Sequence, residues 1–85
     1  MAFFLYIIYS ENKDRYYTGY TGSIETRLEK HNSGATRSTR AGIPWVLVYS
    51  EEFENKSDAI KRELVIKKKK SRRYIEDLIV SKDCD

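Results

Sequence analysis

The sequence predicts an α/β protein of the α+β type, in which helices flank a three-stranded antiparallel sheet. Two segments rich in aromatic and β-branched residues are separated by a short polar turn, and a third such segment follows later in the chain. Apolar residues at helical spacing occupy the stretches between and after these segments. The expected order of elements is β-β-α-β-α-α, and 85 residues suit one domain, residues 1–85.

The first two predicted strands form an antiparallel hairpin. Residues 2–10 and 15–20 have the composition of strands, and the polar residues 11–14 form the turn between them. A four-residue loop gives the register Ser10 opposite Arg15, Ile8 opposite Tyr17, and Tyr6 opposite Gly19. Tyr6 and Tyr17 are then diagonal neighbours on one face, and a glycine opposite a tyrosine is expected to leave open space above the sheet.

The first predicted helix begins after the hairpin and ends at a glycine. Thr21 or Ser23 can cap its start by accepting a hydrogen bond from a backbone amide of the first turn. Ile24 and Leu28 carry its apolar face inward. The Asn-Ser-Gly sequence at residues 32–34 ends it after about three turns.

A loop and a third strand follow this helix. Residues 35–42 mix small residues with two arginines and are expected to form an exposed loop. Residues 45–49 are five apolar or aromatic residues that indicate a strand.

Two further helices complete the predicted fold. Asn55 and Asp58 have the spacing of a capping box at the start of the second helix. The apolar residues of this helix are Ala59, Ile60, Leu64 and Ile66. The lysine run 67–70 and Ser71 are expected to interrupt it. The last helix has an apolar stripe made of Tyr74, Ile75, Leu78 and Ile79.

The positive charge is concentrated in one segment. Residues 56–73 contain nine basic and two acidic residues, a net charge of +7, whereas the whole chain has a net charge of +3. A local basic patch favours a polyanionic partner. A solvated, lysine-rich helix face is the alternative interpretation.

Composition also excludes several classes of protein. The single cysteine, Cys84, allows no intrachain disulfide and no cysteine-based metal cluster within one chain. The apolar run at residues 3–9 is far shorter than the roughly 20 residues of a membrane-spanning helix, and it lacks the flanks of a secretion signal. We therefore expect a soluble, cytoplasmic protein.

Five residues are candidates for a catalytic site. Arg27 and His31 share one helix face with the apolar stripe, so both should point toward the sheet. Glu63 lies at the edge of the inward face of the second helix, and Tyr6 and Tyr17 share a sheet face. A carboxylate for a divalent cation, a guanidinium for phosphorane charge, and a phenol or imidazole for proton transfer suit metal-assisted attack on a phosphodiester.

Each candidate also has a purely structural interpretation. Glu63 and Lys67 are spaced i, i+4, as in an ordinary helix-surface ion pair. His31 in the last turn of a helix interacts favourably with the helix dipole. Arg27 can pair with neighbouring glutamates in solvent, and strand tyrosines most often serve packing.

The sequence resembles the GIY-YIG nuclease superfamily over nearly its whole length, in particular its small stand-alone bacterial members. The first two motifs are Phe4-Leu5-Tyr6 and Tyr17-Thr18-Gly19. Farther along, the segments that resemble the family are Arg27-Leu28-Glu29-Lys30-His31-Asn32, the stretch from Thr39-Arg40 through Pro44-Trp45-Val46-Leu47-Val48-Tyr49, and Lys61-Arg62-Glu63. The elements occur in the family's order and at similar spacing.

This resemblance implies a function and a role for each candidate. It implies hydrolysis of a DNA phosphodiester with one Mg²⁺ or Mn²⁺, held by Glu63. Arg27 would stabilise the scissile phosphate, and His31 would assist proton transfer. Tyr6 or Tyr17 would orient or deprotonate the attacking water.

We therefore predict a divalent-metal-dependent endonuclease that acts on branched, damaged or single-stranded DNA without strong sequence specificity, with RNA as a further partner to consider. Phosphate contacts would come from Arg37, Arg40, Lys67, Lys68, Lys69, Lys70, Arg72 and Arg73. The family often has an asparagine after the glutamate, and none follows Asn55 here. This absence motivates the alternative of a non-catalytic nucleic-acid-binding module that uses segment 56–73. A third alternative is a protein whose basic helix binds an acidic partner.

Overall fold

The computed structural model describes residues 2–83 of the chain, so Cys84 lies outside the described residues. Its elements are β1 (Phe3–Ser10), β2 (Arg15–Thr21), α1 (Ile24–Ser33), the 3-10 helix η1 (Arg37–Gly42), β3 (Trp45–Phe53), α2 (Lys56–Lys69) and α3 (Arg72–Asp83). The predicted order β-β-α-β-α-α is confirmed, with η1 added between α1 and β3. None of the helices within residues 2–83 has the length and apolar character needed to cross a membrane.

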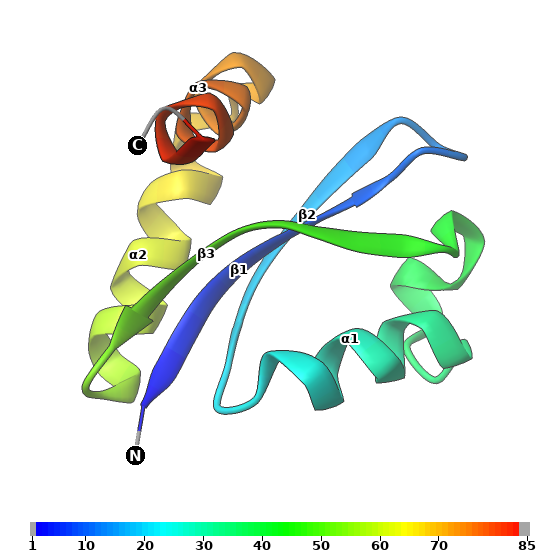
Figure 1. Cartoon of the computed structure of the whole chain (residues 1–85), viewed down its shortest axis with the longest axis horizontal. Coiled ribbons are helices and arrows are strands. Elements are labelled where there is room, and N and C mark those ends of the chain that lie inside the picture. Colours follow the sequence, from blue (N-terminus) through cyan, green and yellow to red (C-terminus); the bar gives the residue numbers. More distant parts are fainter. Residues whose placement is uncertain (1, 84–85) are drawn as a thin grey trace.

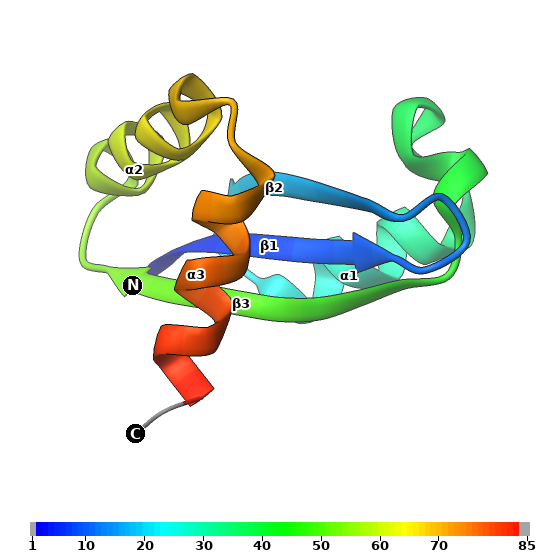
Figure 2. The same cartoon turned by 90° about the horizontal axis from the view of Figure 1, so that it is seen from above.

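The sheet has the strand order β2-β1-β3, and both pairs of neighbours are antiparallel. Helix α1 lies on one face of the sheet (Figure 1). Helix α3 crosses the opposite face, and α2 runs beside it toward the β2 edge (Figure 2). Strand β1 is therefore central, while β2 and β3 are edge strands.

Alternation along β1 divides the core into two clusters. Leu5 and Ile7 point to one face, where they pack with Ile66 of α2 and with apolar residues of α3. Tyr6 and Ile8 point to the other face, where they pack against α1 and the aromatic side chain at the start of β3. All four of these β1 side chains are buried. This alternation is what a central strand covered on both faces requires.

The hairpin register is confirmed at all three predicted pairs, but the expected space above the sheet is filled. Gly19 pairs with Tyr6, and the Tyr6 ring itself lies over the glycine. A Cβ atom at Gly19 would stand 2.6 Å from the Tyr6 hydroxyl oxygen and 2.8 Å from the ring carbon that bears it. The close approach that the glycine permits is thus made by a side chain of the protein.

The helix ends follow the predicted signals. Ser23, rather than Thr21, caps α1, and its side chain accepts a hydrogen bond from a backbone amide of the first turn. Asn55 caps α2 in the same way. Gly34 ends α1 with a φ of 84°, and Lys70 ends α2 with a φ of 49°, within the lysine run where an interruption was expected.

Helix α2 places an acidic residue on its buried face. Ala59 and Ile66 are buried, and Glu63 lies between them at positions i, i+4 and i+7. Leu64, which was expected among the apolar residues of this helix, is instead 57% exposed. Glu63 therefore belongs to the inward stripe itself rather than to its edge.

The expected loop over residues 35–42 is wrong in most of its length. Residues Arg37–Gly42 form η1, in which Thr39 and Gly42 are buried. The indole Nε1 of Trp45 donates a hydrogen bond of 2.7 Å to the backbone oxygen of Thr39. The indole ring also packs directly on Gly42, where a Cβ atom would stand 2.5 Å from it. These contacts with the side chain of Trp45, at the start of the following strand, order a segment that has weak local signals.

The third strand extends beyond the predicted residues 45–49 and ends at Phe53. The polar residues at 50–52 join it because the first half of β1 needs partners on this side. Leu5 pairs with Glu51, for example, in the part of the β1–β3 ladder that precedes the register shift between Ile7 and Ile8. Hydrogen bonding to β1 thus outweighs the low strand propensity of this polar stretch.

The Tyr6–Gly19 contact predicts that Gly19→Ala destabilises the protein. The added methyl group must displace the Tyr6 ring, and overpacking of this kind costs about 1–3 kcal/mol in the free energy of unfolding. Gly22→Ala is the matched control, because its Cβ would meet Phe3 at an ordinary 3.8 Å. Urea unfolding of both variants checks this, and equal stability for the two would contradict it.

Candidate active site

Four of the five predicted site residues line one cleft of about 350 Å³ at the β2 edge of the sheet. The cleft is lined by Tyr6, Tyr17, Gly19, Tyr20, Arg27 and Glu63. These residues come from β1, β2, α1 and α2. Because α1 and α2 cover different faces of the sheet, their side chains meet only by reaching around its edge. The fifth predicted residue, His31, lies behind the cleft.

His31 is fully buried and is hydrogen bonded at both ring nitrogens. Its Nε2 lies 3.0 Å from the Tyr6 hydroxyl, and its Nδ1 lies 2.8 Å from the Thr39 hydroxyl oxygen. The Thr39 hydroxyl donates to the backbone oxygen of Thr36 at 3.3 Å, so it accepts from Nδ1–H. Nε2 then accepts from Tyr6, which directs the phenol proton inward and leaves the oxygen lone pairs toward the cleft.

Burial sets the protonation of this pair. Desolvation raises the pKa of Tyr6 above its usual value, although the neighbouring Arg27 guanidinium partly offsets this. Desolvation also lowers the pKa of His31, and the positive charge of Arg27 adds to that effect. At neutral pH Tyr6 is therefore protonated and His31 is uncharged.

Arg27 brings a positive charge to the cleft, and one of its hydrogen-bond donors has no acceptor among the described residues. Its guanidinium lies next to the Tyr6 hydroxyl, and this hydrogen-bonding interaction is the main cause that raises the pKa of Arg27. Its Nε atom is buried and has no hydrogen-bond partner within residues 2–83. An unpaired buried donor is costly in a folded protein, so this atom is suited to an acceptor supplied by a ligand.

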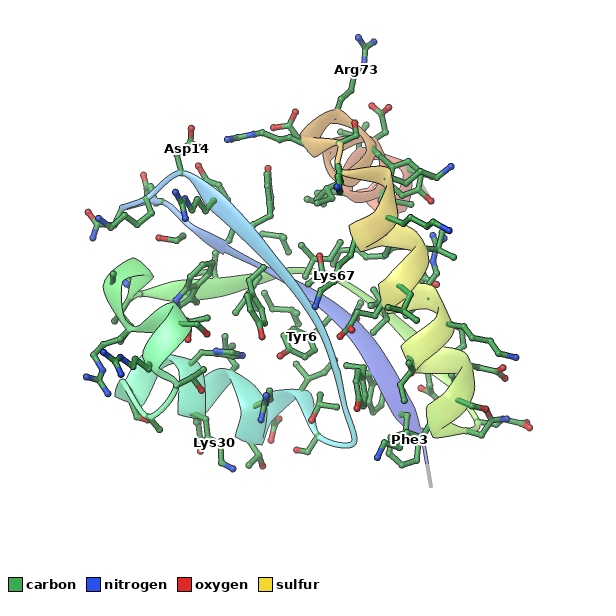
Figure 3. The ribbon with its side chains drawn as sticks, turned by 180° about the vertical axis from the view of Figure 1, so that it is seen from behind. Phe3, Tyr6, Asp14, Lys30, Lys67 and Arg73 are labelled. Carbon is green, nitrogen blue, oxygen red and sulfur yellow. The ribbon has the colours of Figure 1, made fainter. Side chains whose placement is uncertain are left out.

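Glu63 faces the cleft and is paired with Lys67. Its side chain is only 14% exposed, and its Oε1 lies 3.5 Å from the Lys67 Nζ. The same ammonium group lies 5.9 Å above the centre of the Tyr17 ring. Figure 3 shows Lys67 reaching toward the middle of the molecule, near Tyr6. Glu63 therefore forms the helix-surface ion pair of the structural interpretation and also lines the cleft, as the catalytic interpretation requires.

The donors in the cleft fit a hydrated divalent cation rather than a closed metal site. Within the part of the chain that the structure describes, Glu63 is the one carboxylate that lines the cleft. Among residues 2–83, no three histidine, cysteine, aspartate or glutamate side chains gather to hold a metal ion. Mg²⁺ is commonly bound by one or two carboxylates together with waters and substrate phosphates, and an open cleft with one carboxylate allows that arrangement. Lys67 would have to release the carboxylate oxygen with which it pairs.

Three of the predicted nucleic-acid contacts line a second hollow next to the cleft. These residues are Lys67, Lys70 and Arg72, at the junction of α2 with α3. Arg72 is already engaged there, because it pairs with Asp14 at 2.6 Å and with Glu76 at 3.1 Å. Two lysines of the run therefore retain the greater capacity to contact phosphate.

The other predicted nucleic-acid contacts lie elsewhere on the molecule. Lys68 is exposed on α2, and the Lys69 ammonium lies 5.5 Å from the centre of a tyrosine ring of α3. Arg73 points away from the body of the molecule (Figure 3). Arg37 and Arg40 are on η1, at the end of the molecule opposite to α2 (Figure 1). The eight predicted residues thus do not form one patch.

Two residues contribute to the site without having been predicted. Thr39 orients His31, but its segment was expected to be an exposed loop. Tyr20 adds a third phenol to the cleft. Strand alternation assigns it to the face opposite to Tyr17, and only its position at the sheet edge allows it to line the same cleft.

The fold and this cleft together define a class: a small α+β domain with two tyrosines of a hairpin, a helix arginine and a helix glutamate at one sheet edge. The chain belongs to the GIY-YIG family, since the family model for the GIY-YIG catalytic domain matches residues 2–75. The resemblance inferred from the motifs is thereby confirmed. Membership in this family indicates a nuclease-type function with a nucleic acid as substrate.

The chain is also similar to small bacterial proteins of the UPF0213 group. The chain is 42% identical over 65 residues to the UPF0213 protein of Staphylococcus haemolyticus, covering 75% of this chain and 78% of that protein. It is 44% identical over 54 residues to a UPF0213 protein of Streptococcus agalactiae, where the match covers 62% of this chain and 61% of that protein. The solution NMR structure of the UPF0213 protein BH0048 from Bacillus halodurans is 35% identical. Its TM-score is 0.60, and the match covers 96% of this chain and 86% of that one.

The buried histidine predicts that the free energy of unfolding rises with pH around neutrality. The pKa of His31 is lower in the folded protein than its ordinary value of 6.5, so the unfolded chain binds the extra proton. Stability is then complete above about pH 6.5 and decreases below it, by at most about 1.4 kcal/mol per pH unit. Urea unfolding between about pH 5 and 7.5 measures this rise. His31→Gln is the control, since the chain has one histidine, and an equal rise in that variant would refute the assignment.

Proposed function

We propose that the protein is an endonuclease that hydrolyses DNA phosphodiester bonds with a divalent cation, Mg²⁺ or Mn²⁺, and without strong sequence specificity. The observation that supports this best is the convergence of Tyr6, Arg27 and Glu63 on one cleft from three different elements. A phenol, a guanidinium and a carboxylate are suited to position water, neutralise phosphorane charge and hold a hard cation.

Arg27 binds the scissile phosphate in this proposal. Its buried Nε lacks an acceptor within the described residues, and a phosphate oxygen would supply one. Hydrogen bonds between a guanidinium and a phosphate are among the strongest in proteins because both groups are charged. The arginine therefore gains its missing partner only when the substrate is bound, and it stabilises the charge that develops in the transition state.

Tyr6 positions the attacking water. Its proton is directed to His31, so its oxygen can accept a hydrogen bond from the water. As the water oxygen bonds to phosphorus, the water proton moves to the Tyr6 oxygen, and the bond to the leaving oxygen breaks so that this oxygen departs as an alkoxide and takes a proton from solvent. The Tyr6 proton moves at the same time to Nε2 of His31. The neutral state of His31 keeps this nitrogen available as an acceptor.

Glu63 would hold the divalent cation. When bound, it would supply positive charge that stabilises the phosphorane. Glu63 would have to release Lys67 to hold the cation, which would leave Lys67 available to the substrate backbone.

A cleavage assay with purified protein tests the proposal. Branched, nicked and single-stranded DNA are incubated with Mg²⁺ or Mn²⁺, and product formation is followed with time. Glu63→Gln should reduce the cleavage rate by about 10²- to 10³-fold, as expected for loss of a charge-stabilising contact. Glu29→Gln is the matched control, because this glutamate is exposed on α1, and it should cleave at the wild-type rate. Equal rates for wild type and Glu63→Gln would exclude this site.

The ion pair between Glu63 and Lys67 favours a second candidate function, which is binding of nucleic acid without cleavage. Lys67 already balances the charge of the Glu63 carboxylate, so no cation is needed before a phosphate backbone can bind beside it. In this case single-stranded DNA binds in EDTA and binds Glu63→Gln equally well. Phosphate contacts from Arg27, Lys67 and Lys70 predict about a 20-fold loss of affinity between roughly 50 and 200 mM salt. Fluorescence anisotropy measures this dependence. Affinity that does not change with salt would exclude a phosphate-binding surface.

A further inference from the structure

A second hollow of about 410 Å³ adjoins the candidate active site. It lies between β2 and the junction of α2 with α3. Tyr17 lines both the hollow and the cleft. Lys67 lines the hollow, and its ammonium group reaches Glu63 in the cleft at 3.5 Å. A polymeric ligand bound in the cleft can therefore continue into the hollow.

The walls and the rim of this hollow differ in chemistry. Ile66 and Ile75 provide apolar walls, together with the ring of Tyr16. Arg15 and Lys70 are exposed at the rim, and neither has an ion-pair partner within residues 2–83. The hollow therefore combines an apolar interior with unpaired positive charge at its entrance.

Arg72 lines the side of the hollow next to the hairpin turn and is bonded to that turn. This side chain donates to the Asp14 backbone oxygen at 3.0 Å and pairs with the Asp14 carboxylate, which ties the hairpin turn to α3. Its guanidinium carbon also lies 5.2 Å from the centre of the Tyr16 ring. Arg72 is thus engaged by protein groups on one side of the hollow, next to the hairpin turn.

We propose that this hollow is a subsite for one unpaired nucleotide of the substrate, next to the phosphate bound in the cleft. The base packs against the apolar walls, and its phosphate contacts Lys70 and Arg15. The proposal rests on the proposed function and narrows its substrate class. The substrate is a nucleic acid with at least one unpaired nucleotide beside the bond that is cut.

Size and chemistry both favour a nucleotide as the occupant. The volume lies within the range of about 300–1,000 Å³ that is typical of small-ligand pockets. A surface that bound only the phosphate backbone would need cations but no apolar interior. A base in a regular duplex is stacked and paired, so its faces are not available to such walls. An unpaired base can instead turn out and pack on apolar and aromatic side chains.

Binding of two short oligonucleotides in EDTA tests the subsite. One is a single-stranded pentanucleotide, and the other has the same sequence with an abasic site at its centre. The intact oligonucleotide should bind the wild-type protein at least about fivefold more tightly, because packing of one base contributes at least about that factor. The backbone amides of Thr18, Ser71 and Ile75 should shift in NMR spectra with the intact oligonucleotide and much less with the abasic one.

Two variants separate the base from the phosphate contribution. Ile75→Phe fills the hollow, so the ratio of the two affinities should fall to about one, with folding checked by thermal unfolding because Ile75 packs on the core. Lys70→Gln should weaken both oligonucleotides by the same factor and keep the ratio. Lys30→Gln removes the same charge from α1, where Lys30 points into solvent (Figure 3), and should leave both affinities unchanged.

Equal binding of the intact and abasic oligonucleotides by the wild-type protein would overturn the subsite. So would an unchanged ratio in a folded Ile75→Phe protein. Because EDTA removes divalent cations, these measurements do not depend on cleavage. If the wild-type protein cleaves DNA with Mg²⁺ but binds the intact and abasic oligonucleotides equally, only the subsite is refuted. Absence of cleavage with base discrimination retained would refute the nuclease and keep the hollow as the nucleotide site of a binding module.

Discussion

The contact between the Tyr6 ring and Gly19 positions the rest of the site. Tyr6 is on the central strand, and a tyrosine there would ordinarily end beneath the side chain of its neighbour on β2. The absence of a side chain at Gly19 lets the ring extend across β2 and brings the hydroxyl to the edge of the sheet. His31 and Arg27 meet the phenol at that point. One backbone position without a Cβ therefore decides where the chemistry lies.

The edge of the sheet is also where both helical layers are accessible. Helix α1 supplies Arg27 from one face, and α2 supplies Glu63 from the other. A site in the middle of either face would reach only one of these helices. The same geometry makes the site part of the core, because His31 is fully buried and must be hydrogen bonded on both sides to be stable there. Packing and protonation at the site therefore depend on each other.

Local signals predict those parts of the structure that neighbouring residues determine. The hairpin register followed from the turn length, and Ser23 and Asn55 capped their helices as their side chains suggest. The α1 stripe also placed Arg27 and His31 inward. Helix α2 was harder to orient, since it is rich in lysine and exposes two large apolar residues. Its inward face is clear only when Glu63 is counted as one of the buried positions.

Features that depend on distant partners could not be predicted in this way. Residues 50–52 are polar, and they form a strand because β1 requires hydrogen-bond partners along its whole length. Residues 37–42 are ordered by the Trp45 ring. Thr39 is therefore buried beside His31, although the small and basic residues around it in the sequence do not predict its burial. In the strand the stabilising free energy comes from pairing with β1, and in residues 37–42 it comes from packing on the Trp45 ring, which the local propensity of either segment does not indicate.

The net charge of +7 counted along residues 56–73 is larger than the positive charge that is available to a polyanion in the folded protein. Arg62 pairs with Glu51 of β3 at 3.1 Å, and Arg72 pairs with Asp14 of the hairpin turn at 2.6 Å. Both acids lie outside the segment, so counting along the chain misses them. Such pairs order the helices against the sheet and weaken the field beyond them. The positive charge that remains for a phosphate backbone is concentrated where this pairing stops, at the C-terminal end of α2, directly beside the cleft.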